Sequence, residues 1–273
     1  MTDAVRIWFQ KHTVEGRLPL LDDGYRRHVA AVAAEGTEVR FESLPPATYE
    51  SPLPEGFVRY GSAEAMFSWF FAAQAHTAER AGYDAYVIGT SQDPGLPEAR
   101  ALASIPVLGY GETAFFTCAS LGMRFGVVGF IPELAEPISE NIHRYGLERW
   151  FAGFEYLEDA AGIVEEALSG NPDTFLDLFA ARCTAMARRG AHIVVPGEGL
   201  PNEILFSRGV RQAGGLPILD ADGLLIRAAE HAVALRRRGI VPPATAGYRF
   251  RTLPDEQQGR LFELFAPPPA RDR

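Results

Sequence analysis

The chain has 273 residues, of which 47% are hydrophobic and 22% are charged, so its composition is typical of a soluble globular protein with one large core or two smaller ones. Its net charge of −9 argues against nucleic-acid binding, which needs a clustered basic surface. No apolar stretch reaches the ~18 residues of a membrane span, and the N-terminus lacks the pattern of a secretion signal, so we expect a cytoplasmic protein.

Apolar runs alternate with helical patterns along the first part of the chain. We expect strands at residues 4–9, 39–41, 84–89 and 105–108, and helices at residues 20–35, 62–80, 97–102 and from 109 to 121. The polar residues 10–13 are expected to form a turn after the first strand. Ser62 is expected to cap the helix that it begins.

The alternation starts again after residue 121. We expect strands at residues 123–130, 152–157, 191–196 and 216–219, and helices at residues 133–145, 172–189, 202–213 and 220–238. This pattern predicts an α/β fold of two similar Rossmann-like halves with parallel sheets. The first half is residues 1–112, completed by the helix at 220–238, and the second half is residues 113–219. Residues 239–273 contain two proline clusters and are expected to form an extended tail.

Two segments suggest more than a structural role. The segment from Pro45 to Tyr60 contains four prolines, so it is expected to be a loop, long enough to act as a lid. The helix at 62–80 has large apolar residues on more than one face, at Met66, Phe67, Trp69, Phe70 and Phe71. That pattern fits either deep burial or a subunit interface in a homo-oligomer.

Polar and glycine-rich turns follow two of the expected buried strands. Gly89–Leu96 follows the strand that ends at Ile88, and Gly197–Asn202 follows the strand that ends at Pro196. Open α/β sheets bind their ligands at the carboxyl ends of the strands. We therefore expect these two turns to face each other across an active-site cleft between the halves.

Four stretches share their pattern with one known family: Asp93–Leu96 followed by Glu98–Arg100, Pro106–Ala114, Ala191–Gly197 and Pro217–Asp220. They resemble the aspartate/glutamate/hydantoin racemase superfamily, and most of all its hydantoin racemase branch, over residues 4–238. The resemblance implies two similar α/β halves with the active site between them. It also implies an oligomer.

The resemblance breaks down at the residues that carry the family's chemistry. Family racemases place one cysteine thiolate on each side of the substrate α-carbon, and the resemblance aligns Thr90 with the first cysteine and Glu198 with the second. The chain's own cysteines, Cys118 and Cys183, fall inside expected helices, where a buried and unreactive thiol is typical. A racemase mechanism based on two cysteines is therefore not expected.

Glu198 and Thr90 are the main catalytic candidates. Glu198 lies between Gly197 and Gly199 at the end of an apolar strand, where partial burial would raise its pKa and suit it to acid/base catalysis. Thr90 and Ser91 can hold a carboxylate, a carbonyl or a developing oxyanion, or simply cap the next helix. Gly197 and Gly199 are expected to contact the substrate beside Glu198.

The residues after the first strand reach the same cleft. His12 is a third catalytic candidate as an acid/base group, and Lys11 and Gln10 are candidates for binding the substrate. Glu112 matches a family position near the site, where it either supports the site through hydrogen bonds or complements a helix dipole. Asp93 is expected to act in the turn, and Asp220 to cap the last helix.

No cofactor is expected. The six histidines show no ligand spacing with one another or with the cysteines, so a metal site is not indicated. Neither a G-x-G-x-x-G turn after the first strand nor a Walker motif occurs, so a nucleotide is not indicated. The expected partner is a small-molecule substrate.

The sequence supports three hypotheses. The first is a cofactor-independent enzyme in which Glu198 acts as general acid/base on a small carbonyl, carboxylate or cyclic amide or imide compound, with hydrolysis or lysis favoured over isomerisation. The second is a racemase or isomerase of hydantoin or amino-acid type that uses groups other than cysteine. The third is a ligand-binding protein that kept the cleft and lost catalysis.

Overall fold

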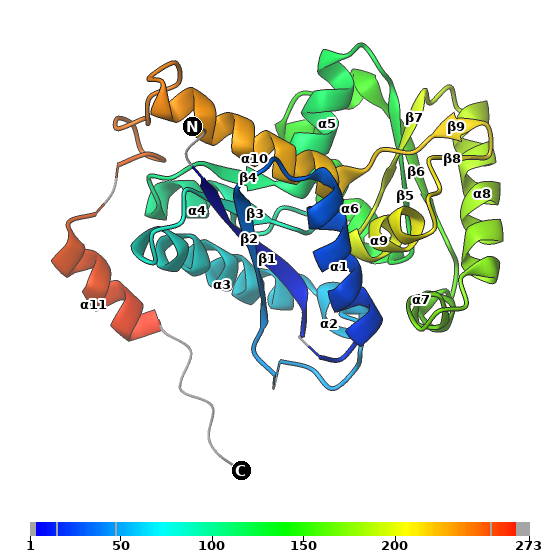
Figure 1. Cartoon of the computed structure of the whole chain (residues 1–273), viewed down its shortest axis with the longest axis horizontal. Helices are drawn as coiled ribbons and strands as arrows, with labels where there is room; N and C mark the ends of the chain where they lie inside the picture. The colour runs from blue at the N-terminus through cyan, green and yellow to red at the C-terminus, as the bar shows by residue number, and fades with distance from the viewer. Residues whose placement is uncertain (1–3, 15, 47, 252, 266–273) are drawn as a thin grey trace.

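The computed structural model describes residues 4–14, 16–46, 48–251 and 253–265, and it has two α/β halves, each built on a parallel sheet (Figure 1). The first sheet has the order β2-β1-β3-β4 and the second has the order β6-β5-β7. The seven parallel strands are β1 (Val5–Val14), β2 (Thr37–Leu44), β3 (Ala85–Ile88), β4 (Val107–Gly109), β5 (Phe125–Gly129), β6 (Phe151–Tyr156) and β7 (Ile193–Pro196). This confirms the expected fold class.

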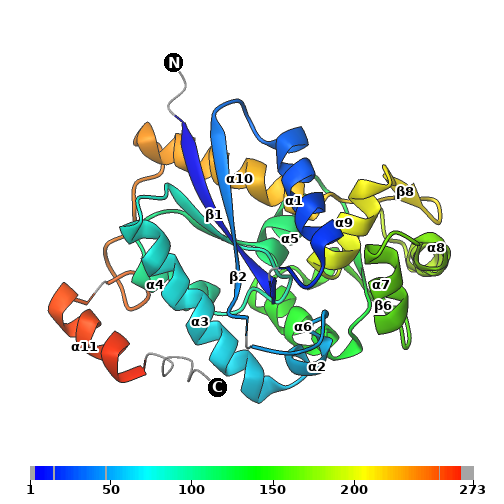
Figure 2. The same cartoon turned by 60° about the horizontal axis from the view of Figure 1, so that its bottom comes forward.

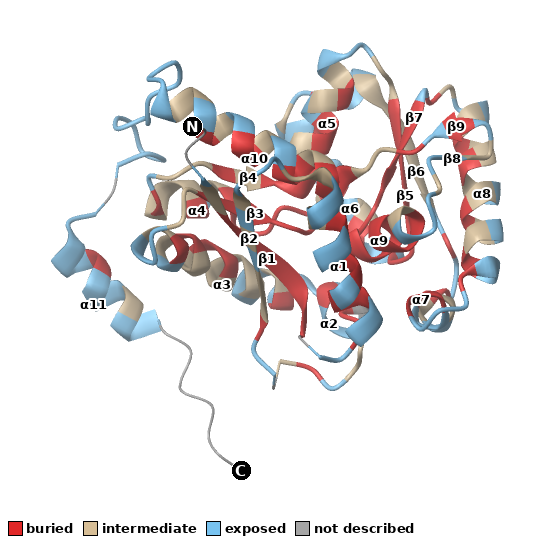
Figure 3. Ribbon diagram, in the orientation of Figure 1, coloured by how far each residue is buried: buried red, intermediate tan, exposed pale blue. Residues whose placement is uncertain are grey.

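The central strands are apolar along their whole length because they are covered on both faces. Every residue of β3, β5 and β7 is buried. Figure 3 shows the buried residues gathered in these strands and on the sides of the helices that face them. A short antiparallel pair, β8 (Gln212–Ala213) and β9 (Leu216–Pro217), lies beside the second sheet, and the bridge from Val194 to Ile218 joins the chain after β9 to β7.

The helices connect the strands and cover the sheets. In the first half these are α1 (Pro19–Val32), α2 (Glu55–Val58), α3 (Gly61–Arg80), α4 (Leu96–Leu102) and α5 (Tyr110–Ser120). After β5 come η1 (Pro132–Leu134), α6 (Ala135–Arg144), η2 (Glu148–Trp150), α7 (Ala161–Leu168), α8 (Asp173–Arg188), α9 (Gly199–Ser207), α10 (Ala221–Arg237) and α11 (Asp255–Phe265). None of the described helices is long and apolar enough to cross a membrane.

The last long helix returns to the first half. α10 packs against β1, β3, β4 and α5, although it follows the second half along the chain. The Asp220 side chain accepts a hydrogen bond from the Gly223 backbone N–H at 3.1 Å, which confirms the expected cap. Figures 1 and 2 both show α1, α9 and α10 side by side, and all three helices contact one another.

Several expectations about local structure were wrong. Residues 10–13 form no turn, because β1 continues to Val14. Its pairing with β2 shifts register between Gln10, which pairs with Glu42, and Val14, which pairs with Leu44. Ser62 does not cap α3, which starts at Gly61 with Tyr60 as its N-cap residue. The helix expected at 202–213 is α9, which begins and ends earlier. α2 lies within the expected 45–60 loop, and α7 was not expected at all.

The tail also differs from the expected extended segment. Within it, α11 is a helix that packs on α3, with the rings of Phe262 and Trp69 centred 5.5 Å apart. The Trp69 indole donates to the Phe265 carbonyl at 3.2 Å. Part of the second apolar face of α3 is therefore covered by this chain's own C-terminal helix. Residues 266–273 of the expected tail lie outside the described residues.

Candidate active site

A cavity lies where the carboxyl ends of strands from both halves meet. Its volume is about 30 Å³, room for about two water molecules. It is lined by residues that follow β3, β5 and β7 or lie near the end of β1, together with residues of α1 and of the 45–60 segment: His12, Thr13, Tyr25, Pro54, Val58, Gly89, Thr90, Gln92, Phe130, Ile131, Leu134, Glu198, Gly199 and Leu200. The position matches the general rule for ligand sites in open α/β sheets.

Glu198 is buried in the wall of this cavity, with 7% of its surface exposed. The backbone N–H of Phe130 donates to both of its carboxyl oxygens at 3.2 Å, and the N–H of Ile131 donates to one at 3.3 Å. Burial raises the pKa of Glu198 to about 8, although these two N–H groups oppose the shift. Glu198 therefore holds its proton at neutral pH and is suited to act as a general acid.

Two glycines make room for the Glu198 carboxyl. A methyl group on Gly129 would lie 2.7 Å from its Oε1 atom. A methyl group on Gly197 would lie 2.8 Å from the Gly129 Cα, so the two backbones can approach this closely only because Gly197 lacks a side chain. Gly197 thus stands behind the carboxyl and does not line the cavity.

Thr90 faces the same cavity from the other half. Its hydroxyl donates to the Gln92 side-chain oxygen at 2.6 Å, so its proton points to an amide and not to a base. Asn141 donates to the Gln92 carbonyl at 2.7 Å and ties this turn to α6. Ser91 is buried and does not line the cavity.

Asp93 holds the Gly89–Leu96 turn in place through its hydrogen bonds. Its carboxyl accepts hydrogen bonds from the backbone N–H groups of Gly111 (2.9 Å) and Glu112 (2.7 Å) and from the Tyr145 hydroxyl (3.0 Å). Burial raises the pKa of Asp93 to about 7, and these three hydrogen bonds lower it in part. The side chain therefore serves the turn, as expected from the sequence.

His12 lines the cavity as a neutral imidazole. Its ring lies 4.4 Å from that of Phe67 and 5.4 Å from that of Phe71, between centroids. Burial lowers the pKa of His12 to about 4, so it carries no charge near neutrality. Its Nδ1 atom is buried and has no hydrogen-bond partner among the described residues.

The other candidates from the sequence do not line the cavity. Gln10 bonds to the carbonyls of Lys11 (3.1 Å) and Glu42 (3.2 Å). Lys11 forms a buried ion pair with Asp22 at 2.7 Å, and Glu112 forms an ion pair with Arg100. The structure thus brings together His12, Thr90, Glu198 and Gly199, and leaves Gln10, Lys11, Ser91, Glu112 and Gly197 around them.

Both cysteines lie away from the cavity. Burial raises the pKa of Cys118 and of Cys183 to about 12, so neither is a thiolate at neutral pH. Within the described part of the chain, no three His, Cys, Asp or Glu side chains are grouped so that they could hold a metal ion.

Sequence reasoning missed several lining groups. Tyr25 lies in the middle of α1, one helical turn from Leu21 and from Val29, so it looks like a core residue. Gln92 lies inside the Gly89–Leu96 turn, but no spacing distinguishes it from the polar residues around it. The N–H groups of Phe130 and Ile131 are backbone donors just past β5, where any residue can supply them.

Comparisons with known proteins agree on one family. The family model described as Asp/Glu/Hydantoin racemase matches residues 26–229. The hydantoin racemase of Rhizobium meliloti is 30% identical over 172 residues, which are 62% of this chain and 68% of that protein.

Two solved structures extend the likeness to the fold. The allantoin racemase of Klebsiella pneumoniae superposes with a TM-score of 0.71 at 22% identity, covering 92% of this chain and 94% of that one. An unliganded arylmalonate decarboxylase superposes with a TM-score of 0.54 at 15% identity, covering 84% and 93%. Since the family match spans most of the chain, this protein belongs to the Asp/Glu/Hydantoin racemase family.

Proposed function

We propose that this chain is a cofactor-independent enzyme in which Glu198 delivers a proton to one face of a small carbonyl, carboxylate or cyclic amide compound. The observation that carries this proposal is the Glu198 carboxyl, which is buried in the wall of the cavity between the two halves, where burial raises its pKa to about 8. A buried acid whose pKa lies near the working pH is well matched to general acid catalysis.

Lysis at the α-carbon is the reaction that this arrangement fits best. In a substituted malonate, the bond from the α-carbon to one carboxylate breaks, and its electron pair moves onto the α-carbon and the neighbouring carbonyl as CO₂ leaves. The proton on Glu198 then passes to the α-carbon, and solvent protonates Glu198 again. Hydrolysis of a cyclic amide fits second, with Glu198 protonating the departing nitrogen.

Racemisation fits less well, because it needs acid/base groups on both faces of the carbon. Across the cavity from Glu198, Thr90 gives its proton to the Gln92 amide oxygen, which is too weak a base to activate a hydroxyl. His12 is neutral but its pKa near 4 makes it a weak base at neutral pH. Thr90 is suited instead to bind a substrate oxygen.

The relatives allow either chemistry. The curated relative is a racemase by name, and the arylmalonate decarboxylase with the same fold is a lyase by name. Their names therefore fit either a racemase or a lyase reaction for this chain.

Proton NMR in D₂O tests the proposal with hydantoins, amino acids, substituted malonates and cyclic imides. Wild type, Glu198→Gln and, as a matched control, Glu166→Gln on the exposed surface of α7 are run side by side. We expect new product signals from wild type and from the control, and none from Glu198→Gln. Deuterium exchange without a new product would favour the isomerase hypothesis. Binding of a compound by all three proteins without exchange or a new product would favour the ligand-binding hypothesis.

A further inference from the structure

Tyr25 reaches the cavity from the core of the first half. It lies on α1 with 4% of its surface exposed, and its ring packs on Phe9 and Phe41 with centroids 5.9 and 5.2 Å away. Unlike these two rings, Tyr25 also lines the cavity that contains Glu198. Packing on Phe9 and Phe41 accounts for the burial of the ring, but it does not account for the position of the hydroxyl group.

The Tyr25 hydroxyl lies at the junction of the two halves. A methyl group on Gly199 would be 2.9 Å from this hydroxyl, 3.5 Å from the Gly89 carbonyl oxygen and 3.6 Å from a carboxyl oxygen of Asp222. Gly89 directly precedes Thr90, and Gly199 directly follows Glu198. The hydroxyl thus lies beside the backbone that carries both main catalytic candidates.

The hydroxyl keeps its proton in this position. Burial raises the pKa of Tyr25 well above its usual value, and the carboxyl groups of Asp222, Glu203 and Asp22 raise it further. A neutral phenol is a good hydrogen-bond donor to a carbonyl or to a developing oxyanion, because it offers an O–H group that needs no charge partner.

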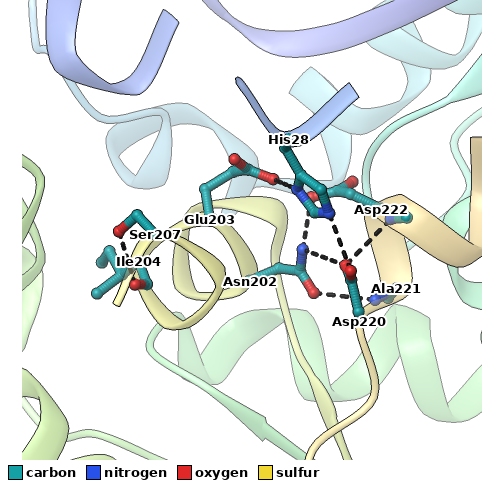
Figure 4. A network of polar contacts seen from close by, with 9 residues as sticks. His28, Asn202, Glu203, Ile204, Ser207, Asp220, Ala221 and Asp222 are labelled. Atoms are coloured by element: carbon teal, nitrogen blue, oxygen red, sulfur yellow. Dashed lines mark hydrogen bonds and ion pairs between the residues drawn. The ribbon is translucent and has the colours of Figure 1, made fainter. Parts of the chain in front are cut away.

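A buried polar cluster lies around His28, one helical turn further along α1 than Tyr25 (Figure 4). His28 contacts Glu203 of α9 through Nδ1 and Asp220 at the start of α10 through Nε2, the latter at 2.9 Å. Burial lowers the pKa of His28, but hydrogen bonds to Asp220 and Glu203 outweigh it and raise that pKa to about 10. The cationic imidazole therefore ties α1 to both other helices.

Asn202 connects this cluster to the catalytic candidate. Its side chain donates to Asp220 at 3.3 Å and to Asp222 at 3.1 Å, and its oxygen accepts from the Ala221 N–H at 2.9 Å. Its backbone N–H donates to the Glu198 carbonyl at 3.3 Å. The first turn of α9 is thus braced against α1 and α10, which fixes the Tyr25 hydroxyl relative to Glu198.

We propose that Tyr25 is a catalytic residue whose hydroxyl donates a hydrogen bond to the substrate oxygen that gains negative charge while Glu198 supplies the proton. This inference rests on the proposed function, and it adds a requirement on the substrate. The reacting carbon must carry a carbonyl or carboxylate oxygen that reaches Tyr25. Simple amines and alcohols are then not substrates.

The variant Tyr25→Phe tests this inference, with Tyr86→Phe as the matched control. Tyr86 is also buried, but its hydroxyl donates to the Phe71 carbonyl at 2.8 Å, away from the cavity lining. With the substrate found for wild type, we expect Tyr25→Phe to lower kcat about 10²-fold with little change in KM, as for other lost oxyanion donors. The Tyr86→Phe variant should keep its kcat. Full activity in Tyr25→Phe, or an equal loss in both variants, would overturn the proposal.

A binding measurement keeps this test separate from the proposed function. If wild type turns over nothing in the panel, the proposed function has failed, and Tyr25 is then tested by NMR titration with hydantoin as the probe. We expect about tenfold weaker hydantoin binding in Tyr25→Phe, the effect of one lost hydrogen bond, and no change in Tyr86→Phe. Equal hydantoin affinity in wild type and Tyr25→Phe, or no binding to either, would overturn the role of Tyr25.

Discussion

Replacing Glu198 with glutamine should make the protein inactive and, at neutral pH, more stable. In the unfolded chain this carboxyl ionises with a pKa near 4.5, whereas burial holds the folded pKa at about 8. At pH 7 the unfolded state therefore gains stability by releasing a proton that the folded state keeps. A glutamine has no such proton, and its amide oxygen can still accept from the Phe130 and Ile131 N–H groups.

The size of this effect follows from the two pKa values. Since pH 7 lies about 2.5 units above 4.5 and each unit corresponds to about 1.4 kcal/mol, the carboxyl costs the folded state about 3 kcal/mol at pH 7. The cost is absent below pH 4.5, grows as the pH rises, and levels off above pH 8. For a chain of this size, 3 kcal/mol corresponds to a rise in Tm of roughly 6–12 °C.

Urea unfolding of wild type and Glu198→Gln at several pH values measures this difference directly. We expect the two free energies of unfolding to converge near pH 4.5 and to separate with a slope of about 1.4 kcal/mol per pH unit towards pH 8. Other titrating groups cancel because both proteins contain them. Equal stability at pH 7, or a difference that does not change with pH, would show that Glu198 is ionised in the folded protein and would refute the general-acid argument.

Three further predictions concern the surroundings of the site. Gly129→Ala places a methyl group 2.7 Å from the Glu198 carboxyl and should lower kcat by about 10²-fold in a protein whose circular dichroism is unchanged; normal kinetics would contradict this packing. Lys11→Met leaves the Asp22 charge buried without its partner and should lower the free energy of urea unfolding by about 3–5 kcal/mol. The double variant Lys11→Met/Asp22→Leu should recover most of that stability. Equal losses of stability in the single and double variants would argue against a stabilising ion pair. The folded pKa of His12 is about 4, below its unfolded value of 6.5, so wild type should lose stability as the pH falls from 6.5 to 4. Over that range the free energy of unfolding of His12→Gln should gain about 3 kcal/mol relative to wild type. Parallel curves of stability against pH for the two proteins would contradict a neutral His12.

The strands and the two turns that line the cavity could be predicted from sequence because their signals are local. Apolar runs such as Ile193–Pro196 are buried on both faces, and a charged residue directly after such a run, like Glu198, has few places to point. The same reasoning placed Thr90 at the end of β3. In both cases the strand supplies the position and the following glycine or polar turn supplies the chemistry.

The extent of β1 could not be predicted, because it depends on distant partners. Residues 10–13 are polar, and their sequence predicts a turn. Lys11 can nevertheless be buried because Asp22 neutralises its charge, and Gln10 can be buried because the backbone carbonyl of Glu42 in β2 accepts a hydrogen bond from its side-chain amide. α11 was missed for a similar reason. Its four apolar residues all lie in its last five positions, and the ring of Phe262 packs against Trp69 of α3, which is distant in the sequence.

Tyr25 shows where sequence reasoning about the site stops. On an amphipathic helix a buried tyrosine is usually a core residue. The spacing of residues in α1 predicts that the ring is buried, but it does not indicate where the hydroxyl lies. Only the position of Gly199, brought next to that hydroxyl by the second half of the chain, shows that the polar end lies at the cavity.

The configuration of the product formed in D₂O distinguishes a single proton donor from proton delivery to both faces of the α-carbon. A prochiral substituted malonate is converted by wild type, and the deuterated acid is analysed by chiral chromatography and mass spectrometry. If Glu198 alone delivers the proton, we expect one enantiomer carrying one deuterium at the α-carbon, and no such product from Glu198→Gln. Equal amounts of both deuterated enantiomers from wild type would mean that protons reach both faces, and the account of a single buried proton donor would be wrong.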